Sequence, residues 1–135
     1  MKQLALQILD LTGKVAIVTG GASGQGKSAS ELFAAHGASV IVADIDEAGA
    51  KAVAERIGGL GIGVDVSKEA DVQRMVAAAE ERYGGLDILF NNAGIGYSAS
   101  SRHKMANVVE TPDEAWDSIL AINLKSVGLG CKHAI

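Results

Sequence analysis

The chain has 135 residues, which suits one domain and is too short for two. Its 48% hydrophobic and 21% charged residues exclude a disordered chain, and its single cysteine, Cys131, excludes a disulfide framework or a cysteine-based zinc site. The net charge of -4 argues against nucleic-acid binding, since the only basic cluster, Arg102-His103-Lys104, is too short to follow a phosphate backbone. No apolar run reaches the ~18 residues that span a bilayer, and the stretch from Leu4 to Leu9 lacks a small-residue cleavage site, so we expect a cytoplasmic protein with no membrane partner.

Short apolar runs alternate along the chain with longer amphipathic stretches. The runs predict strands at 15–19, 39–44, 61–65 and 86–91, and the stretches predict helices at 27–36, 46–57 and 67–83, the last capped by Ser67. This alternation indicates βαβ units and an α/β fold with a doubly wound parallel sheet covered on both faces. Because such crossovers are right-handed, we expect the spatial strand order 3-2-1-4.

A further helix is predicted from Thr111 towards Ile135. Thr111 is expected as its N-cap, Pro112 as its first residue, and Glu114 as the partner of Thr111 in a capping box. Since this apolar helix has no C-cap before Ile135, we expect the sequence to be a fragment of a longer domain.

The glycine-rich turn after the first predicted strand is typical of a phosphate-binding loop. Glycines allow backbone N–H groups to approach a phosphate, and the following helix adds positive potential at its N-terminus. Gly21-Ala22-Ser23-Gly24-Gln25-Gly26-Lys27-Ser28 matches the G-x-x-x-x-G-K-[ST] pattern of nucleotide triphosphatases, in which Lys27 would bind the phosphates. The same loop also fits T-G-x-x-x-G-x-G, with an acid, Asp44, at the end of the next strand for a ribose hydroxyl. The loop alone leaves both interpretations open.

Motifs elsewhere in the chain favour the second interpretation. Asp65-Val66 ends the third predicted strand, Asn91-Asn92-Ala93-Gly94 ends the fourth, and Asn123 lies in the last predicted helix. Together with Thr19 to Gly26, these motifs resemble the short-chain dehydrogenase/reductase family, and so does the approach Leu11-Thr12-Gly13-Lys14-Val15. The resemblance covers nearly the whole chain but only the first half of the family's domain, which implies one NAD-binding, Rossmann-like half-domain over residues 1–135.

The resemblance implies the following cofactor contacts: Gly20, Ser23, Gly24, Gln25, Gly26, Asp44, Ile45, Asp65, Val66, Asn92, Ala93 and Gly94. It also implies a catalytic role for Asn123, which in the family kinks its helix and holds a proton-relaying water. A structural role is the alternative for several of these residues: Asp65 as a turn cap, Asn92 as a tie between two strands, and Asn123 as a buried, satisfied amide. No metal ligand is expected.

The resemblance further implies an oxidoreductase that moves a hydride between NAD and a secondary alcohol or ketone. NAD is favoured over NADP because Asp44 repels a 2′-phosphate, and because Ser23 and Ile45 stand where NADP-preferring relatives carry a base. The family's catalytic Ser and Tyr-x-x-x-Lys do not occur at matching positions among these 135 residues, so we expect the chain alone to be inactive. The last helix is expected to form the interface of a homo-oligomer. Two other functions stay open, a nucleotide triphosphatase and a non-catalytic dinucleotide-binding fragment.

Overall fold

The computed structural model describes residues 9–96 and 107–135. The cluster Arg102-His103-Lys104 and nearly all of the Leu4 to Leu9 stretch therefore lie outside the described residues. The elements are β1 (Val15–Thr19), α2 (Gly24–Ala35), β2 (Ser39–Asp44), α3 (Glu47–Ile57), β3 (Leu60–Gly63), α4 (Glu69–Tyr83), β4 (Ile88–Phe90), α5 (Asp113–Leu120), the π-helical turn η1 (Ala121–Lys125) and α6 (Ser126–Ala134). No helix within the described ranges is long and apolar enough to cross a bilayer.

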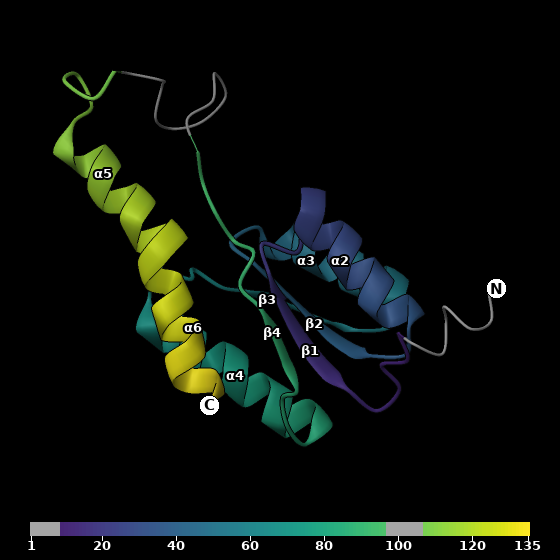
Figure 1. Cartoon of the computed structure of the whole chain (residues 1–135). Coiled ribbons are helices and arrows are strands. Elements are labelled where there is room, and N and C mark those ends of the chain that lie inside the picture. Colours follow the sequence, from purple (N-terminus) through teal and green to yellow (C-terminus); the bar gives the residue numbers. More distant parts are fainter. Residues whose placement is uncertain (1–8, 97–106) are drawn as a thin grey trace.

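The strands form one parallel sheet in the order β3-β2-β1-β4. Ile17 in the middle of β1 is in register with Ile41 of β2 on one side and with Leu89 of β4 on the other. The order confirms the predicted α/β fold with strand order 3-2-1-4. Because all strands are parallel, their carboxyl ends lie at the same edge of the sheet, where the glycine loop and Asp44 also lie (Figure 1).

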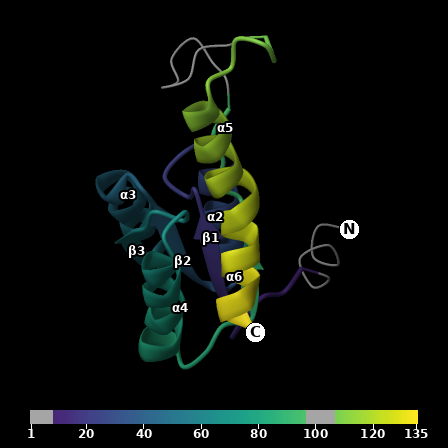
Figure 2. The ribbon, with the colours of Figure 1, turned by 90° about the vertical axis from the view of Figure 1, so that its left-hand side faces the viewer.

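Each face of the sheet carries its own apolar core. Side chains on one face, among them Ile17 and Ile41, pack with Met75 of α4 and Leu129 of α6. Side chains on the other face, Val18, Val40 and Val42, pack against α2 and α3. Figures 1 and 2 show these two pairs of helices on opposite sides of the strands. Burial of β-branched residues on both faces explains why β1 and β2 read as continuous apolar runs.

Several predicted boundaries are corrected by the structure. The second element begins at Gly24 and not at Lys27, because the glycines themselves form the first turn of α2. The N-cap of α4 is Lys68 and not Ser67, because the Ser67 hydroxyl donates to the carboxylate of Asp65 instead. The strand predicted at 61–65 is β3, Leu60–Gly63, and the strand predicted at 86–91 is the shorter β4, Ile88–Phe90.

The last predicted helix differs most from its expectation. Its N-cap is Pro112 and no side chain caps it, so the predicted capping box of Thr111 and Glu114 is wrong. The Thr111 hydroxyl donates to the Asn107 carbonyl at 2.8 Å, which takes it away from the helix N–H groups. The helix is also interrupted by η1 between α5 and α6. α6 packs beside α4, where Lys132 and His133 both contact the Glu69 carboxylate, while α5 extends past the carboxyl ends of the strands (Figures 1 and 2).

Candidate functional site

The glycine loop between β1 and α2 is closed by direct backbone contact. Gly20 has φ of +66°, a left-handed conformation that side chains disfavour. A Cβ atom on Gly26 would lie 2.0 Å from the Gly20 carbonyl oxygen and 2.6 Å from Asn92 Nδ2. A side chain at position 26 would therefore clash with the Gly20 carbonyl, and a side chain at position 20 would strain the left-handed backbone. The loop presents its backbone and the start of α2 to the pocket, together with the exposed residues Ser23 and Gln25. Backbone N–H groups at the start of a helix are the donors that a phosphate group needs.

Thr19 and Asn92 fasten this loop to the end of β4. The buried Thr19 hydroxyl accepts the backbone N–H groups of Asn92 and Ala93, both at 3.0 Å, and donates to the Phe90 carbonyl at 3.3 Å. The Asn92 amide donates back to the carbonyls of Thr19 at 3.0 Å and Gly20 at 3.4 Å. The strand-tying role considered for Asn92 is thus present in the structure. It places the Ala93-Gly94 backbone beside the glycine loop.

Asp44 ends β2 with its carboxylate turned to the glycine loop. Its Oδ2 accepts the Ala22 N–H at 3.0 Å, and its Oδ1 accepts the Asp46 N–H at 3.0 Å. These two bonds fix the carboxylate, and each oxygen keeps capacity for a further donor. Ile45, which follows, has 74% of its surface exposed.

Asp65 stabilises the turn between β3 and α4. Its Oδ1 accepts the Ser67 hydroxyl at 2.6 Å and the Ser67 N–H at 3.1 Å. The bond from the Ser67 hydroxyl is the main cause that lowers the pKa of Asp65, against partial burial that raises it. The Asp65 N–H is in turn accepted by Asp71, whose pKa is lowered chiefly by that bond. The turn-capping role considered for Asp65 is therefore present.

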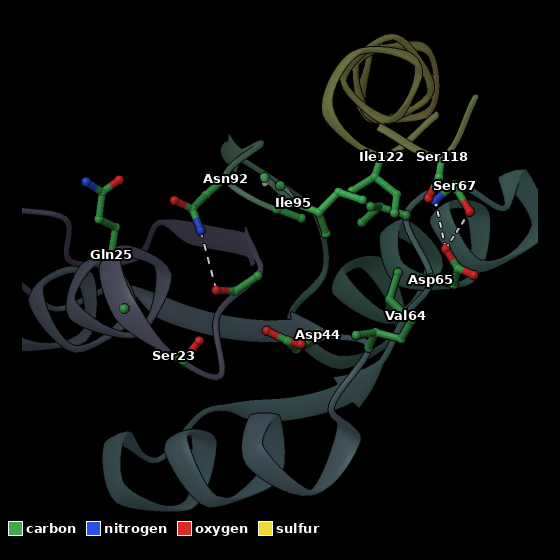
Figure 3. Close-up of a pocket in the computed structure, with 17 residues that line it drawn as sticks. Ser23, Gln25, Asp44, Val64, Asp65, Ser67, Asn92, Ile95, Ser118 and Ile122 are labelled. Atoms are coloured by element: carbon green, nitrogen blue, oxygen red, sulfur yellow. Dashed lines mark hydrogen bonds between the residues drawn. The ribbon is translucent and has the colours of Figure 1, made fainter. Parts of the chain in front are cut away.

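These groups surround a pocket of about 830 Å³ at the carboxyl edge of the sheet, shown in Figure 3. Its volume is within the range of ligand and cofactor sites. Predicted site residues that line it are Gly20, Ser23, Gly24, Gln25, Asp44, Ile45, Asp65, Val66, Asn92, Ala93 and Gly94. Two predicted residues, Gly26 and Asn123, do not line it. Within the described residues, no group of three or more His, Cys, Asp or Glu side chains could hold a metal ion.

Sequence reasoning missed six lining residues: Val64, Ser67, Ile95, Gly96, Ser118 and Ile122. Val64, Ser67, Ile95 and Gly96 directly neighbour predicted motifs, so extending each motif by one or two residues would have found them. Ser118 and Ile122 lie on the helix that passes over the pocket (Figure 3). No local pattern marks them, because their placement depends on how that helix packs.

Asn123 acts on the pocket through Ile95. Its Oδ1 accepts the Ile95 N–H at 2.8 Å, and its Nδ2 donates to the Ile95 carbonyl at 2.7 Å. Asn123 is exposed, so the buried-amide alternative is wrong, although the amide is satisfied. Asn123 lies in η1, where the Ser126 N–H bonds to the Ala121 carbonyl five residues earlier. The Ser126 hydroxyl donates to the Ile122 carbonyl, which an α-helix would have paired with that N–H.

Comparisons with known proteins agree with this arrangement. The family model described as short chain dehydrogenase matches residues 14–135. Tropinone reductase-like 1 of Erythroxylum coca is 46% identical over 126 residues, which are 92% of this chain and 45% of the relative. The mitochondrial borneol dehydrogenase of Lavandula x intermedia is 44% identical over 124 residues, 92% of this chain and 46% of the relative.

A solved structure is also similar. The 3-ketoacyl-(acyl-carrier-protein) reductase from Brucella melitensis, complexed with NADH, has a TM-score of 0.85 and 42% sequence identity over 93% of this chain and 50% of that one. The chain thus spans about half the length of the relatives it matches. The family model matches nearly the whole described sequence, from just before β1 to Ile135. On this match, the chain belongs to the short chain dehydrogenase family.

Proposed function

We propose that the chain is one NAD-binding half-domain, residues 1–135, of an oxidoreductase that moves a hydride between NAD and a secondary alcohol or ketone. The observation that carries this is the pocket itself, which joins the glycine loop, the Asp44 carboxylate and the Ala93-Gly94 backbone at one sheet edge. The similar reductase from Brucella melitensis was solved with NADH, which supports a nicotinamide cofactor.

The residues present fit such a cofactor. The close approach of Gly20 and Gly26 leaves backbone N–H groups and the N-terminus of α2 open to a diphosphate, which is dianionic. The fixed carboxylate of Asp44 would accept ribose hydroxyls, and the Asn92 to Gly94 segment would stand behind the nicotinamide ribose. Once bound, the cofactor supplies the hydride chemistry, and this half of the protein supplies orientation.

We propose NAD rather than NADP as the cofactor because the negative charge of Asp44 would repel a 2′-phosphate. Both of its oxygens are held toward the pocket by backbone N–H groups, so the carboxylate cannot easily turn away from a 2′-phosphate. The neighbouring lining residues Ser23 and Ile45 offer no positive charge to offset the repulsion.

The exposed face of α5, η1 and α6 supports a homo-oligomer. Trp116, Leu120, Leu124 and Val127 are 37% to 66% exposed and recur at helical spacing. We propose that this face meets a second copy in a dimer or tetramer, and that Leu124→Glu shifts the sedimenting species of the complete protein towards the monomer. Sedimentation of the unmodified protein as a monomer at micromolar concentration would contradict this. A cytoplasmic location without nucleic-acid partners remains a prediction from composition.

The test is titration of the 135-residue chain with NADH and with MgATP, followed by fluorescence or calorimetry. We expect NADH to bind and MgATP not to hydrolyse, since the family match argues against the triphosphatase pattern at Lys27. We also expect no turnover with NAD and secondary alcohols, because these residues hold no Tyr-x-x-x-Lys to donate a proton. MgATP hydrolysis without NADH binding would overturn the proposal. Turnover by the chain alone would refute its expected inactivity.

A further inference from the structure

The pocket has no cationic side chain to meet a diphosphate. Its lining residues contain neither Lys nor Arg, and they include the carboxylates of Asp44 and Asp65. Lys27 is the only charged residue in the first turn of α2, and it does not line the pocket. A dianionic group bound here must therefore rely on neutral donors and on the helix N-terminus.

Most polar side chains of the lining are already engaged. The Asn92 amide donates to the carbonyls of Thr19 and Gly20, and the Ser67 hydroxyl donates to Asp65. Three lining side chains have no hydrogen-bond partner among the described residues, namely Ser23, Gln25 and Ser118. Gln25 differs from the two serines because its exposed side chain is longer and ends in an amide with two N–H donors. It is the one lining side chain with an uncommitted N–H₂ group.

Gln25 also stands at the place where a diphosphate is expected. It is the second residue of α2, after the N-cap Ser23 and Gly24, next to the exposed backbone of the glycine loop. Figure 3 shows Gln25 at the same end of the pocket as Asn92, away from the end formed by Asp65 and Ser67. From this position a flexible amide can reach a group that lies on the loop.

We propose that the side-chain amide of Gln25 donates to the cofactor diphosphate, in the place of a basic residue. This rests on the proposed function, because it assigns a contact within the same pocket. A neutral donor holds the diphosphate without adding positive charge near Asp44, so discrimination against a 2′-phosphate is kept. It also predicts that NADH affinity depends weakly on salt, since no ion pair is formed.

The test compares Gln25→Met, Gln25→Glu and Gln25→Lys by calorimetry with NADH, ADP-ribose and AMP as probes. We expect Gln25→Met to weaken NADH and ADP-ribose about tenfold, the loss of one hydrogen bond to a charged group, and to leave AMP unchanged. Gln25→Glu should weaken the binding of NADH and of ADP-ribose about a hundredfold, because its carboxylate repels the diphosphate. Gln25→Lys should bind both probes at least as tightly as the native chain does. Gln73→Met and Gln73→Glu, at an exposed position of α4 outside the pocket, are the matched controls and should change nothing.

Thermal unfolding separates a binding effect from a folding effect. An acid in the first turn favours a helix and a base disfavours it, so Gln25→Glu should be at least as stable as the native chain while binding worse, and Gln25→Lys the reverse. Native NADH affinity in Gln25→Glu would overturn the inference, and so would a loss seen with NADH but not with ADP-ribose, which places the contact on the nicotinamide half. If the folded native chain binds neither NADH nor ADP-ribose, the proposed function itself fails.

Discussion

Replacement of Thr19 by Val tests how the glycine loop is held on the sheet. The Thr19 side chain is buried, with 2% of its surface exposed, and valine has the same branching at Cβ. The change replaces only the hydroxyl, by a methyl group, and that hydroxyl accepts the N–H groups of Asn92 and Ala93 and donates to the Phe90 carbonyl. The packing of β1 in the sheet should therefore persist, while two N–H donors lose their acceptor.

The expected loss follows from those donors. A buried donor left without a partner costs about 1–3 kcal/mol, and the partial exposure of Asn92 and Ala93 lets water replace some of the lost bonds. We expect the free energy of unfolding to fall by roughly 2–3 kcal/mol, a large share of the ~5–15 kcal/mol of a typical domain. Urea unfolding followed by circular dichroism measures it. Thr19→Ser keeps the hydroxyl and should retain most of the stability. Equal stability of Thr19→Val and the native chain would refute the reasoning.

Three further outcomes are expected. Asp44→Ala should narrow the preference for NADH over NADPH by at least tenfold, about 1.4 kcal/mol, in parallel binding titrations, and equal native affinity for the two cofactors would contradict the role of that carboxylate. Gly26→Val should abolish NADH binding, since its side chain would enter the space of the Gly20 carbonyl, whereas Lys27→Ala should change it little; loss of all nucleotide affinity in Lys27→Ala would instead favour a triphosphatase. The pKa of Asp65 is lowered in the folded state, mainly by the Ser67 hydroxyl, so its contribution to stability is present above about pH 4 and is lost as the pH falls through the folded-state pKa. Asp65→Asn should accordingly lose less stability than the native chain on acidification, which melting curves at several pH values would show.

The sequence predicts β1 and β2 well because these strands are buried on both faces and therefore read as unbroken apolar runs. β3 and β4 are only partly buried, and both are shorter than their predicted ranges. Strand order then follows from the handedness of the crossovers. Helix starts are predicted less well, since they depend on competition for hydrogen bonds. Ser67 and Thr111 are good capping residues, but Asp65 and the Asn107 carbonyl offer their hydroxyls closer partners. A capping pattern cannot reveal such a competitor outside the helix.

The residues of the candidate site are likewise predictable from the sequence only in part. Residues at strand ends, such as Asp44 and Asn92, are predictable because parallel strands bring their carboxyl ends to one edge. Gly26 belongs to the glycine loop, but it packs against the Gly20 backbone and does not line the pocket. The motif alone cannot distinguish these two positions. Ser118 and Ile122 reach the pocket only because α5 and η1 pass above it, a tertiary arrangement without a local sequence signal.

The bond pair between Asn123 and Ile95 makes one backbone amide a reporter for the contact of η1 with the segment after β4. The Asn123 side-chain amide bonds to both the N–H and the carbonyl of Ile95. It thus gives this residue the two backbone partners that a neighbouring strand would otherwise supply. The Ile95 N–H lies beyond the end of β4 and has no sheet partner in the described residues, so its exchange with heavy water depends on Asn123. Slow exchange at Ile95 would then measure how rarely the contact between Asn123 and Ile95 opens, and Asn123→Ala should bring this single amide to the rate of an open chain.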